Sequence, residues 1–171
     1  MSVLFSSISC FVFDVDGVLT DGTVLVLENG LQARRMSIKD GFALQLAVKK
    51  GYRVLILSGA AVSPVVDRLQ KLGIDDIQMG ITDKAAFLKN YLQHENIPAS
   101  SVLFMGDDLP DIGVMGLVGI AACPADAAPE VKDVSTYISS IDGGMGCVRE
   151  VIREVMKARG DWAPEQGVAS R

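Results

Sequence analysis

Residues 11–22 read FVFDVDGVLTDG, an apolar run that ends in two aspartates two positions apart. The run predicts a buried strand, and Gly17 allows a sharp turn where that strand stops. Open α/β sheets build their sites at the carboxyl ends of such strands. An Asp-Gly pair after a strand is often only a turn, but Asp14 lies inside the apolar run, where a carboxylate is costly unless it is paired or bound to a metal. The segment therefore indicates a functional site.

The rest of the chain alternates short apolar runs with helical segments, which predicts a parallel sheet covered by helices on both faces. Strands are expected at Cys10–Val15, Arg53–Ser58, Ile77–Met79, Val102–Met105, Val118–Ala121 and Thr136–Ile138. Helices are expected at Asp40–Lys50, Ser63–Leu72, Asp83–Glu95, Leu109–Met115 and Met145–Ala158. The fold class is thus a three-layer, Rossmann-like α/β domain over residues 1–160, followed by a mobile tail over residues 161–171.

One insertion interrupts this alternation. Thr23–Leu27 and Leu31–Met36 flank an Asn-Gly pair at positions 29 and 30, which is a strong signal for a hairpin turn. A small β-hairpin over residues 23–36 is therefore expected to project beside Asp14 and Asp16. No segment is long enough to form a separate cap domain.

Composition limits the function further. A chain of 171 residues that is 49% hydrophobic is long enough for one domain with a substantial core. The net charge of −5 provides no basic surface for nucleic acid. Asp14 and Asp16 interrupt the first apolar run, so neither a signal peptide nor a membrane span is expected. Cys10, Cys123 and Cys147 form no close-spaced pair, which argues against disulfides and zinc and favours the cytoplasm.

Two further segments place polar groups after apolar strands. Ser58 and Gly59 follow one strand and could hold a phosphate oxygen through a hydroxyl and a backbone N–H, although such a pair is usually only a turn. Lys84 lies at the start of a helix, where its charge opposes the helix dipole, although most lone lysines are solvated.

Residues 102–111, VLFMGDDLPD, form the second strong signal because another apolar strand ends in Asp107, Asp108 and Asp111. One of these acids alone could simply start a helix. Together with Asp14 and Asp16 they would repel one another in one crevice unless a cation were bound. An all-oxygen acidic site suits Mg²⁺.

These motifs, in this order, resemble those of the haloacid dehalogenase-like phosphatases. The resemblance rests on residues 14–17, Ser58, Lys84 and residues 106–111. Residues 18–22, 38–41, Gly80 and 142–150 are similar to the capless subfamily of 3-deoxy-D-manno-octulosonate (KDO) 8-phosphate phosphatases. This resemblance implies a keto-sugar acid phosphate as substrate, a role in lipopolysaccharide precursor synthesis, and a homotetramer in which a neighbour helps to close each site.

The resemblance also implies roles that the residue types allow. Asp14 would attack phosphorus and form an aspartyl-phosphate, and Asp16 would protonate the leaving alkoxide and later deprotonate water. Asp14, the main-chain carbonyl of Asp16, and Asp107 would hold Mg²⁺.

The remaining polar groups would support that chemistry. Ser58, Gly59 and Lys84 would bind the phosphoryl oxygens. Asp108 and Asp111 would lie behind the residues that touch the metal, and would orient Lys84 or metal-bound water.

Two departures from the family pattern concern the substrate. Ala60 and Met145 stand where many relatives carry arginines that assist recognition of the phosphate or the sugar. A phosphatase for a nonulosonate 9-phosphate of the KDN or sialic acid type is therefore an alternative. A non-catalytic phospho-binding module is a further alternative. It is opposed by the combined presence of Asp14, Asp16, Ser58, Lys84 and Asp107.

Several other polar residues allow a purely structural interpretation, in some cases beside a functional one. His94 is expected to be solvated, and Cys147 to be a small buried thiol. Arg34 and Arg35 on the hairpin are either solvated or reach a sugar carboxylate in a neighbouring site. Asp40 and Gly41 either start a helix or lie near the active site.

Overall fold

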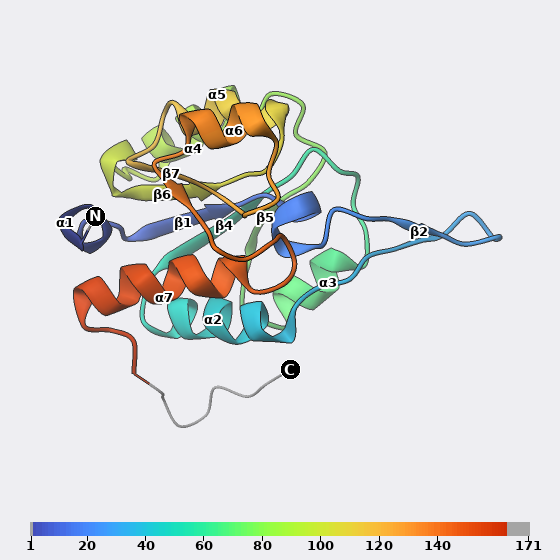
Figure 1. Ribbon diagram of the computed structural model, residues 1–171, viewed down its shortest axis with the longest axis horizontal. Helices are drawn as coiled ribbons and strands as arrows, with labels where there is room; N and C mark the ends of the chain where they lie inside the picture. Colours follow the sequence, from blue (N-terminus) through green and yellow to red (C-terminus); the bar gives the residue numbers. More distant parts are fainter. Residues whose placement is uncertain (1, 164–171) are drawn as a thin grey trace.

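The computed structural model describes residues 2–163 and contains a six-stranded sheet in the order β5-β4-β1-β6-β7-β8 (Figure 1). Every pair of neighbouring strands in this sheet is parallel. Its strands are β1 Cys10–Phe13, β4 Arg53–Leu57, β5 Asp76–Gln78, β6 Val102–Met105, β7 Ile120–Cys123 and β8 Tyr137–Ile138. The predicted parallel α/β sheet is confirmed.

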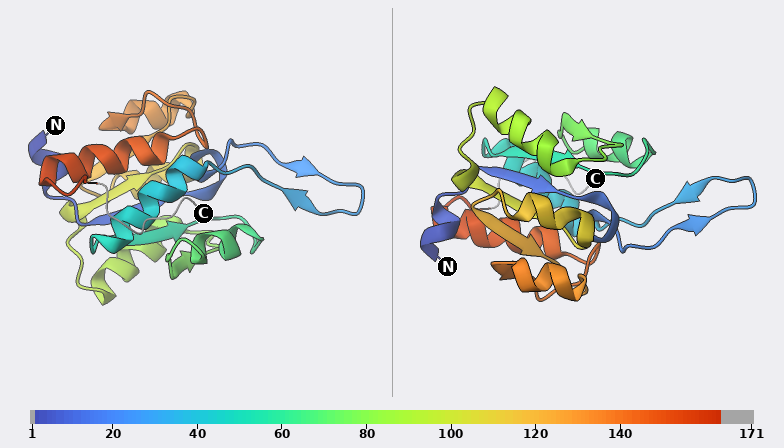
Figure 2. Two further views of the ribbon diagram at one scale, coloured as in Figure 1. Left: turned by 90° about the horizontal axis from the view of Figure 1, so that it is seen from below. Right: turned by 90° about the horizontal axis from the view of Figure 1, so that it is seen from above.

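Helices cover both faces of the sheet, which gives three layers (Figures 1 and 2). One face carries α1 Ser2–Ser6, α2 Ile38–Lys49, α3 Val65–Gln70 and α7 Cys147–Arg159. The other face carries α4 Lys84–His94, α5 Ile112–Met115 and α6 Pro129–Val134. Short helical turns lie at Val15–Leu19, Ala99–Ser101 and Leu109–Asp111.

The central strand β1 shows why both faces are covered. Its side chains alternate between the faces, so Phe11 and Phe13 enter the core under α2 and α7, whereas Cys10 and Val12 enter the core under α4 and α5. All four are buried. The strand therefore reads as a continuous apolar run rather than an alternating one.

Some element boundaries differ from the sequence prediction. β1 ends at Phe13, because the chain turns into the helical segment Val15–Leu19. β7 begins at Ile120, two residues later than expected. Residues 118 and 119 form a bend before the strand. Gly119 lies against Ser100 there, and a Cβ at position 119 would be 2.2 Å from the Ser100 carbonyl oxygen.

Some helices also differ from the expectation. The expected helix Ser63–Leu72 is limited to Val65–Gln70, and Leu109–Met115 starts with a tighter turn before α5. The helices α1 and α6 were not predicted.

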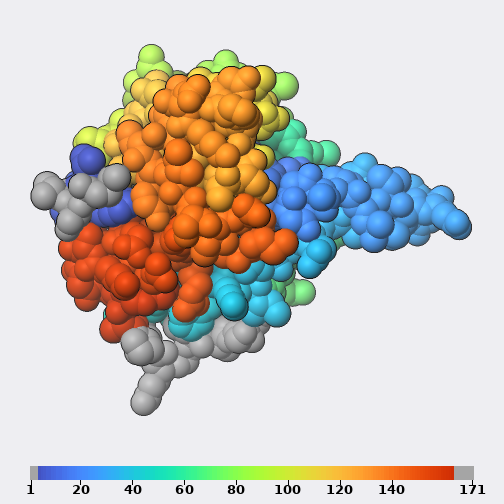
Figure 3. Space-filling view, viewed as in Figure 1, coloured from blue at the N-terminus to red at the C-terminus, as the bar shows by residue number. Residues whose placement is uncertain are grey.

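The predicted hairpin is present and projects from the domain (Figures 1 and 3). Its strands, β2 Leu25–Val26 and β3 Gln32–Ala33, are antiparallel and shorter than the expected ones. Gly30 has a φ of 80°, as an Asn-Gly turn requires. An isolated bridge between Thr20 and Met36 closes the base of the hairpin.

The chain continues to pack on the domain after α7 ends at Arg159. The Tyr52 hydroxyl donates to Asp161 Oδ2 at 2.6 Å. The Arg149 guanidinium lies 5.2 Å from the centre of the Phe42 ring and 5.3 Å from the centre of the Trp162 ring. The rest of the expected tail, residues 164–171, lies outside the described residues. Within residues 2–163 no helix is long and apolar enough to cross a bilayer.

Candidate active site

The strand order reverses at β1, and a cavity of about 460 Å³ lies at the carboxyl ends of β1, β4 and β6. Sites of α/β sheets form at such a reversal. All the site residues predicted from the sequence line this cavity: Asp14, Asp16, Ser58, Gly59, Lys84, Asp107, Asp108 and Asp111. Ala60 lines it as well, whereas Met145 does not belong to its lining.

Asp14 follows β1 directly and is buried, with 7% of its surface exposed. Its backbone N–H donates to the Met105 carbonyl at 3.1 Å, which ties it to β6. Its Oδ1 lies 3.0 Å from Lys84 Nζ. Burial, together with the negative charge of Asp111, raises the pKa of Asp14 to about 6 despite the opposing effect of Lys84. Asp14 is thus a carboxylate in a poorly hydrated position.

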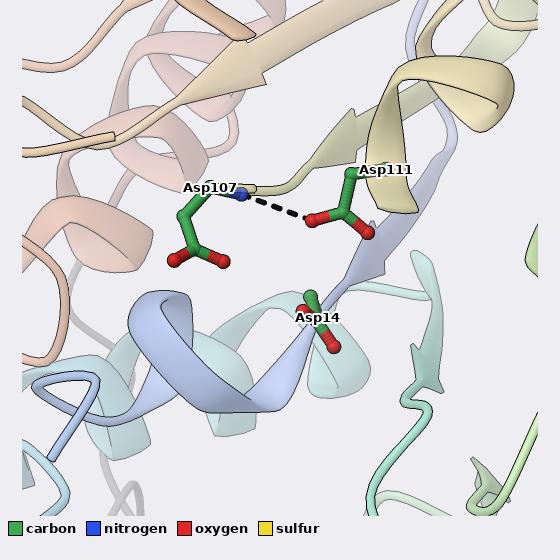
Figure 4. Close-up of side chains that lie close together, drawn as sticks. All are labelled: Asp14, Asp107 and Asp111. Carbon is green, nitrogen blue, oxygen red and sulfur yellow. Dashed lines mark hydrogen bonds between the residues drawn. The ribbon is translucent and has the colours of Figure 1, made fainter. Parts of the chain in front are cut away.

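Asp107 and Asp111 face Asp14 from the segment after β6 (Figure 4). One oxygen from each of the three carboxylates lies within 4.8 Å of the other two. The Asp107 backbone N–H donates to Asp111 Oδ2 at 3.0 Å. Burial, followed by repulsion from Asp14, Asp111 and Asp108, raises the pKa of Asp107 to about 7. The cluster therefore concentrates negative charge.

Two glycines make this crowding possible. Gly17 has a φ of 84°, and a Cβ at this position would be 1.9 Å from Asp107 Oδ2. A Cβ at Gly106 would be 2.4 Å from Asp111 Oδ2. The glycines of the two acidic motifs thus leave the space that the carboxylates occupy.

The donor set fits a hard divalent cation. Asp14 Oδ1 is buried and accepts no hydrogen bond in the described part of the chain, although it forms the ion pair with Lys84. Both oxygens of Asp111 already accept, from Lys84 Nζ at 2.8 Å and from Asp107 N at 3.0 Å. Asp14 and Asp107 are therefore the carboxylates best able to bind a cation, and oxygen ligands suit Mg²⁺.

Lys84 lies between Asp14 and Asp111 and is 7% exposed. Burial acts to lower its pKa, but the two carboxylates outweigh burial and raise the pKa above its ordinary value. Lys84 is therefore a charged residue of the cavity rather than a solvated lysine. Asp111 Oδ1 lies 2.8 Å from Lys84 Nζ, and the role of Asp111 in orienting Lys84 stays a prediction.

Asp108 has a different environment. It is exposed, and its Oδ1 accepts from Leu109 N at 2.8 Å at the start of the following helical turn. Ser58 is buried at the end of β4, and its Oγ accepts from Ala60 N at 3.1 Å. The Ser58 hydroxyl proton is thus left to donate into the cavity.

Asp16 lies in the segment Val15–Leu19, which we call the Asp16 turn, and its own backbone is extended at a kink in that segment. Arg34 donates to both of its oxygens, from Nε to Oδ1 at 2.6 Å and from Nη2 to Oδ2 at 3.2 Å. The Arg34 side chain is only 12% exposed. Of the two interpretations left open for Arg34, the solvated one is therefore wrong, and contact with a sugar carboxylate stays a prediction. Arg35 is 81% exposed and lies 3.7 Å from Asp21, as a surface charge would.

A glycine-rich segment from the far end of the chain supports the Asp16 turn. Gly144 N donates to the Val18 carbonyl at 2.9 Å, and a Cβ at Gly143 would be 1.9 Å from the Gly17 carbonyl oxygen. The buried Cys147 thiol lies 3.4 Å from the same Val18 oxygen. Sequence reasoning used this segment only as a family marker, although its paired glycines were a signal for close backbone contact.

Asp40 anchors the helix that follows this segment. It is buried, and its Oδ1 accepts from Arg149 N at 2.7 Å in the first turn of α7. Burial raises the pKa of Asp40 to about 6, although the hydrogen bonds that it accepts act against this. Asp40 thus joins α2 to α7, and it does not line the cavity. His94 is solvent-exposed, as predicted.

Comparison with known proteins agrees with this geometry. Residues 76–142 match the haloacid dehalogenase-like hydrolase family. The chain is 34% identical over 154 residues to 3-deoxy-D-manno-octulosonate 8-phosphate phosphatase KdsC of Escherichia coli (strain K12), covering 90% of this chain and 82% of that protein. The corresponding protein of Yersinia pestis is 30% identical over the same shares.

Solved structures show the same relationship. The phosphatase of Moraxella catarrhalis, in complex with magnesium, phosphate and KDO, is 30% identical with a TM-score of 0.91 and covers 94% of this chain and 92% of that one. The phosphatase of Yersinia pestis also gives a TM-score of 0.91, at 29% identity, and covers 94% of this chain and 86% of that one. The chain therefore belongs to the haloacid dehalogenase-like hydrolases, within the family of 3-deoxy-D-manno-octulosonate 8-phosphate phosphatases.

Proposed function

We propose that this protein is a Mg²⁺-dependent phosphomonoesterase that hydrolyses KDO 8-phosphate to KDO and phosphate. The observation that carries the proposal is the buried Asp14 at the end of β1, facing Asp107 and Lys84 across the cavity. The proposal is also supported by the 34% identity of this chain, over 90% of its length, to the KDO 8-phosphate phosphatase of Escherichia coli.

Asp14 and Asp16 would perform the covalent steps. An oxygen of Asp14 attacks phosphorus, the bond from phosphorus to the sugar oxygen breaks, and an aspartyl-phosphate forms. Asp16 gives a proton to the leaving alkoxide, then takes a proton from the water that hydrolyses the aspartyl-phosphate. Asp14 is thereby regenerated and phosphate leaves.

The other residues of the cavity would hold the phosphoryl group. The Ser58 hydroxyl and the Gly59 N–H donate to its oxygens, and Lys84, fixed by Asp111, adds a positive charge. Asp14, the main-chain carbonyl of Asp16, and Asp107 would hold Mg²⁺. When bound, Mg²⁺ supplies charge neutralisation of the phosphoryl oxygens.

A panel of phosphate esters tests the proposal. With Mg²⁺ present, KDO 8-phosphate should give the highest kcat/KM, above a nonulosonate 9-phosphate and a neutral sugar phosphate. Asp14→Asn should abolish turnover while the circular dichroism spectrum stays unchanged, because the amide has nearly the same shape but is a poor nucleophile. Asp75→Asn, at an exposed position outside the cavity, is the matched control. Full activity of Asp14→Asn would refute the mechanism.

We further propose that the hairpin assembles the protein into a homotetramer. Its apolar side chains are exposed, with Leu25 at 63%, Val26 at 67% and Leu31 at 62%. The hairpin extends away from the domain, so its own chain does not cover these side chains (Figure 3). Exposed apolar strands of this kind pair with other chains. A neighbouring subunit would then also shield each open cavity from water.

Light scattering provides the test of assembly. The intact chain should give the mass of a tetramer, and replacing residues 25–32 with a short Gly linker should dissociate it. The same deletion should reduce selectivity for large sugar phosphates more than hydrolysis of a small generic ester. A fully active monomer would contradict the proposal.

We also place the enzyme in the cytoplasm, which the three buried free thiols support.

A further inference from the structure

The feature that the mechanism leaves unexplained is the ion pair between Arg34 and Asp16. The two residues are 18 positions apart, and Arg34 reaches Asp16 from the base of the hairpin. The contact is bidentate, at 2.6 Å and 3.2 Å, and the Arg34 side chain is 12% exposed. Bidentate contacts between a guanidinium and a carboxylate are both strong and geometrically specific.

This pair conflicts with the proposed work of Asp16. Both Asp16 oxygens accept N–H groups of Arg34, whereas one of them must reach the leaving oxygen of the substrate. Turning the carboxylate toward the leaving oxygen would break the bidentate geometry, so we expect the pair to open when substrate binds. Opening leaves a mostly buried guanidinium without its anion, which is costly unless another anion takes the place of Asp16.

The surroundings of Arg34 offer a place for such an anion. Beside Arg34 lies a second cavity of about 430 Å³ between β3 and α3. Its lining includes Arg34, Ser63 and Arg68. Ser63 Oγ is buried and has no hydrogen-bond partner within the described residues. The cavity thus offers positive charge and an unsatisfied hydroxyl, next to the group that handles the leaving sugar.

We propose that Arg34 is a specificity-determining residue that exchanges the Asp16 carboxylate for the carboxylate of the sugar acid. The body of the sugar then lies in the cavity between β3 and α3, and Asp16 is released toward the leaving oxygen. The exchange makes catalysis depend on an anionic group at the far end of the substrate. This inference rests on the proposed function, because it takes the substrate to be a sugar acid phosphate.

A simpler role for Arg34 makes a different prediction. If Arg34 only held Asp16 in position, its loss would slow every phosphate ester by the same factor. If Arg34 exchanges partners, its loss penalises carboxylate substrates specifically. The ratio of kcat/KM for a sugar acid to kcat/KM for its uncharged counterpart therefore separates the two roles.

The experiment compares KDO 8-phosphate with the same compound converted to a carboxamide at the carboxylate. The wild-type enzyme should prefer the acid, and Arg34→Gln should reduce this preference by about 10-fold to 100-fold, the range expected for a hydrogen-bonded charge pair. Arg34→Lys keeps the charge but loses the bidentate geometry, so it should retain part of the preference. Arg35→Gln, one residue away at an exposed position, should match the wild type.

A binding measurement complements the kinetics. KDO should inhibit the wild-type enzyme more strongly than its carboxamide, and Arg34→Gln should remove most of that difference. An equal loss of activity on both substrates in Arg34→Gln, or a wild-type enzyme without preference for the acid, would overturn the inference and leave the proposed function intact. If the wild-type enzyme hydrolysed other esters but not KDO 8-phosphate, the proposed function would fail, and the inference with it.

Discussion

Affinity of the free enzyme for Mg²⁺ should fall steeply as pH falls below 7. The carboxylates of Asp14 and Asp107 have pKa values raised to about 6 and about 7, with burial as the largest cause. A cation binds the ionised forms, so protons compete with it. Both groups are ionised at pH 8, and both gain protons between pH 8 and pH 6. Mg²⁺ binding is thus favoured by rising pH.

The magnitude follows from the two pKa values. At pH 6, Asp107, with a pKa of about 7, is ionised in roughly one molecule in ten. Asp14, with a pKa of about 6, is ionised in roughly one molecule in two. Both are then ionised in roughly one molecule in twenty, so the dissociation constant for Mg²⁺ should rise about 20-fold from pH 8 to pH 6.

Calorimetric titration of the free enzyme with Mg²⁺ measures this change without any turnover. Titrations at pH 6 in two buffers with different ionisation enthalpies should show release of more than one proton per ion. Asp107→Asn should bind Mg²⁺ weakly at every pH and lose most of the pH dependence. Asp75→Asn should behave like the wild type. Equal affinities at pH 6 and pH 8, without proton release, would refute the assignment of these carboxylates to the metal.

Three further predictions concern other parts of the structure. Lys84→Ala should lower kcat by about 10²-fold to 10³-fold at saturating Mg²⁺, because the positive charge beside the phosphoryl oxygens is lost. The Mg²⁺ concentration that gives half of the activity should not rise, because Lys84 is not a metal ligand. Gly143→Ala should cost about 1–3 kcal/mol in urea unfolding and reduce kcat, because its methyl group would collide with the Gly17 carbonyl. Asp40→Asn removes a group that binds its proton more tightly in the folded state. As pH rises from about 4 to about 7, the wild type should therefore lose up to about 3 kcal/mol more urea-unfolding stability than the variant.

The sequence predicted the sheet and the residues that gather around the cavity because both depend on local patterns. Each acidic motif follows an apolar strand directly, and parallel strands bring their carboxyl ends to one edge. Asp14 and Asp107 therefore meet although 93 positions separate them. The prediction failed where the local pattern was weak. The helix α6 buries only Val131, so its sequence shows no helical periodicity.

Contacts of the hairpin could not be predicted in the same way. The Asn-Gly pair fixes the turn, but β3 has only two residues, so nothing in the sequence defines which arginine faces the cavity. The structure turns Arg34 toward Asp16 and leaves Arg35 exposed. Similarly, the link from Asp40 to α7 depends on how two helices pack, which single-sequence patterns do not encode.

The support of the Asp16 turn by residues 142–147 has a consequence for synthesis on the ribosome. The nascent chain completes its acidic motifs with Asp111, well before Gly143 and Gly144 leave the exit tunnel. Until these glycines arrive, the Val18 carbonyl lacks the hydrogen bond from Gly144, and the Asp16 turn faces water. The unfinished chain thus carries every carboxylate of the site without the contacts that fix one of them. Phosphatase activity should therefore first appear only after residues 142–147 have left the tunnel and α7 has docked.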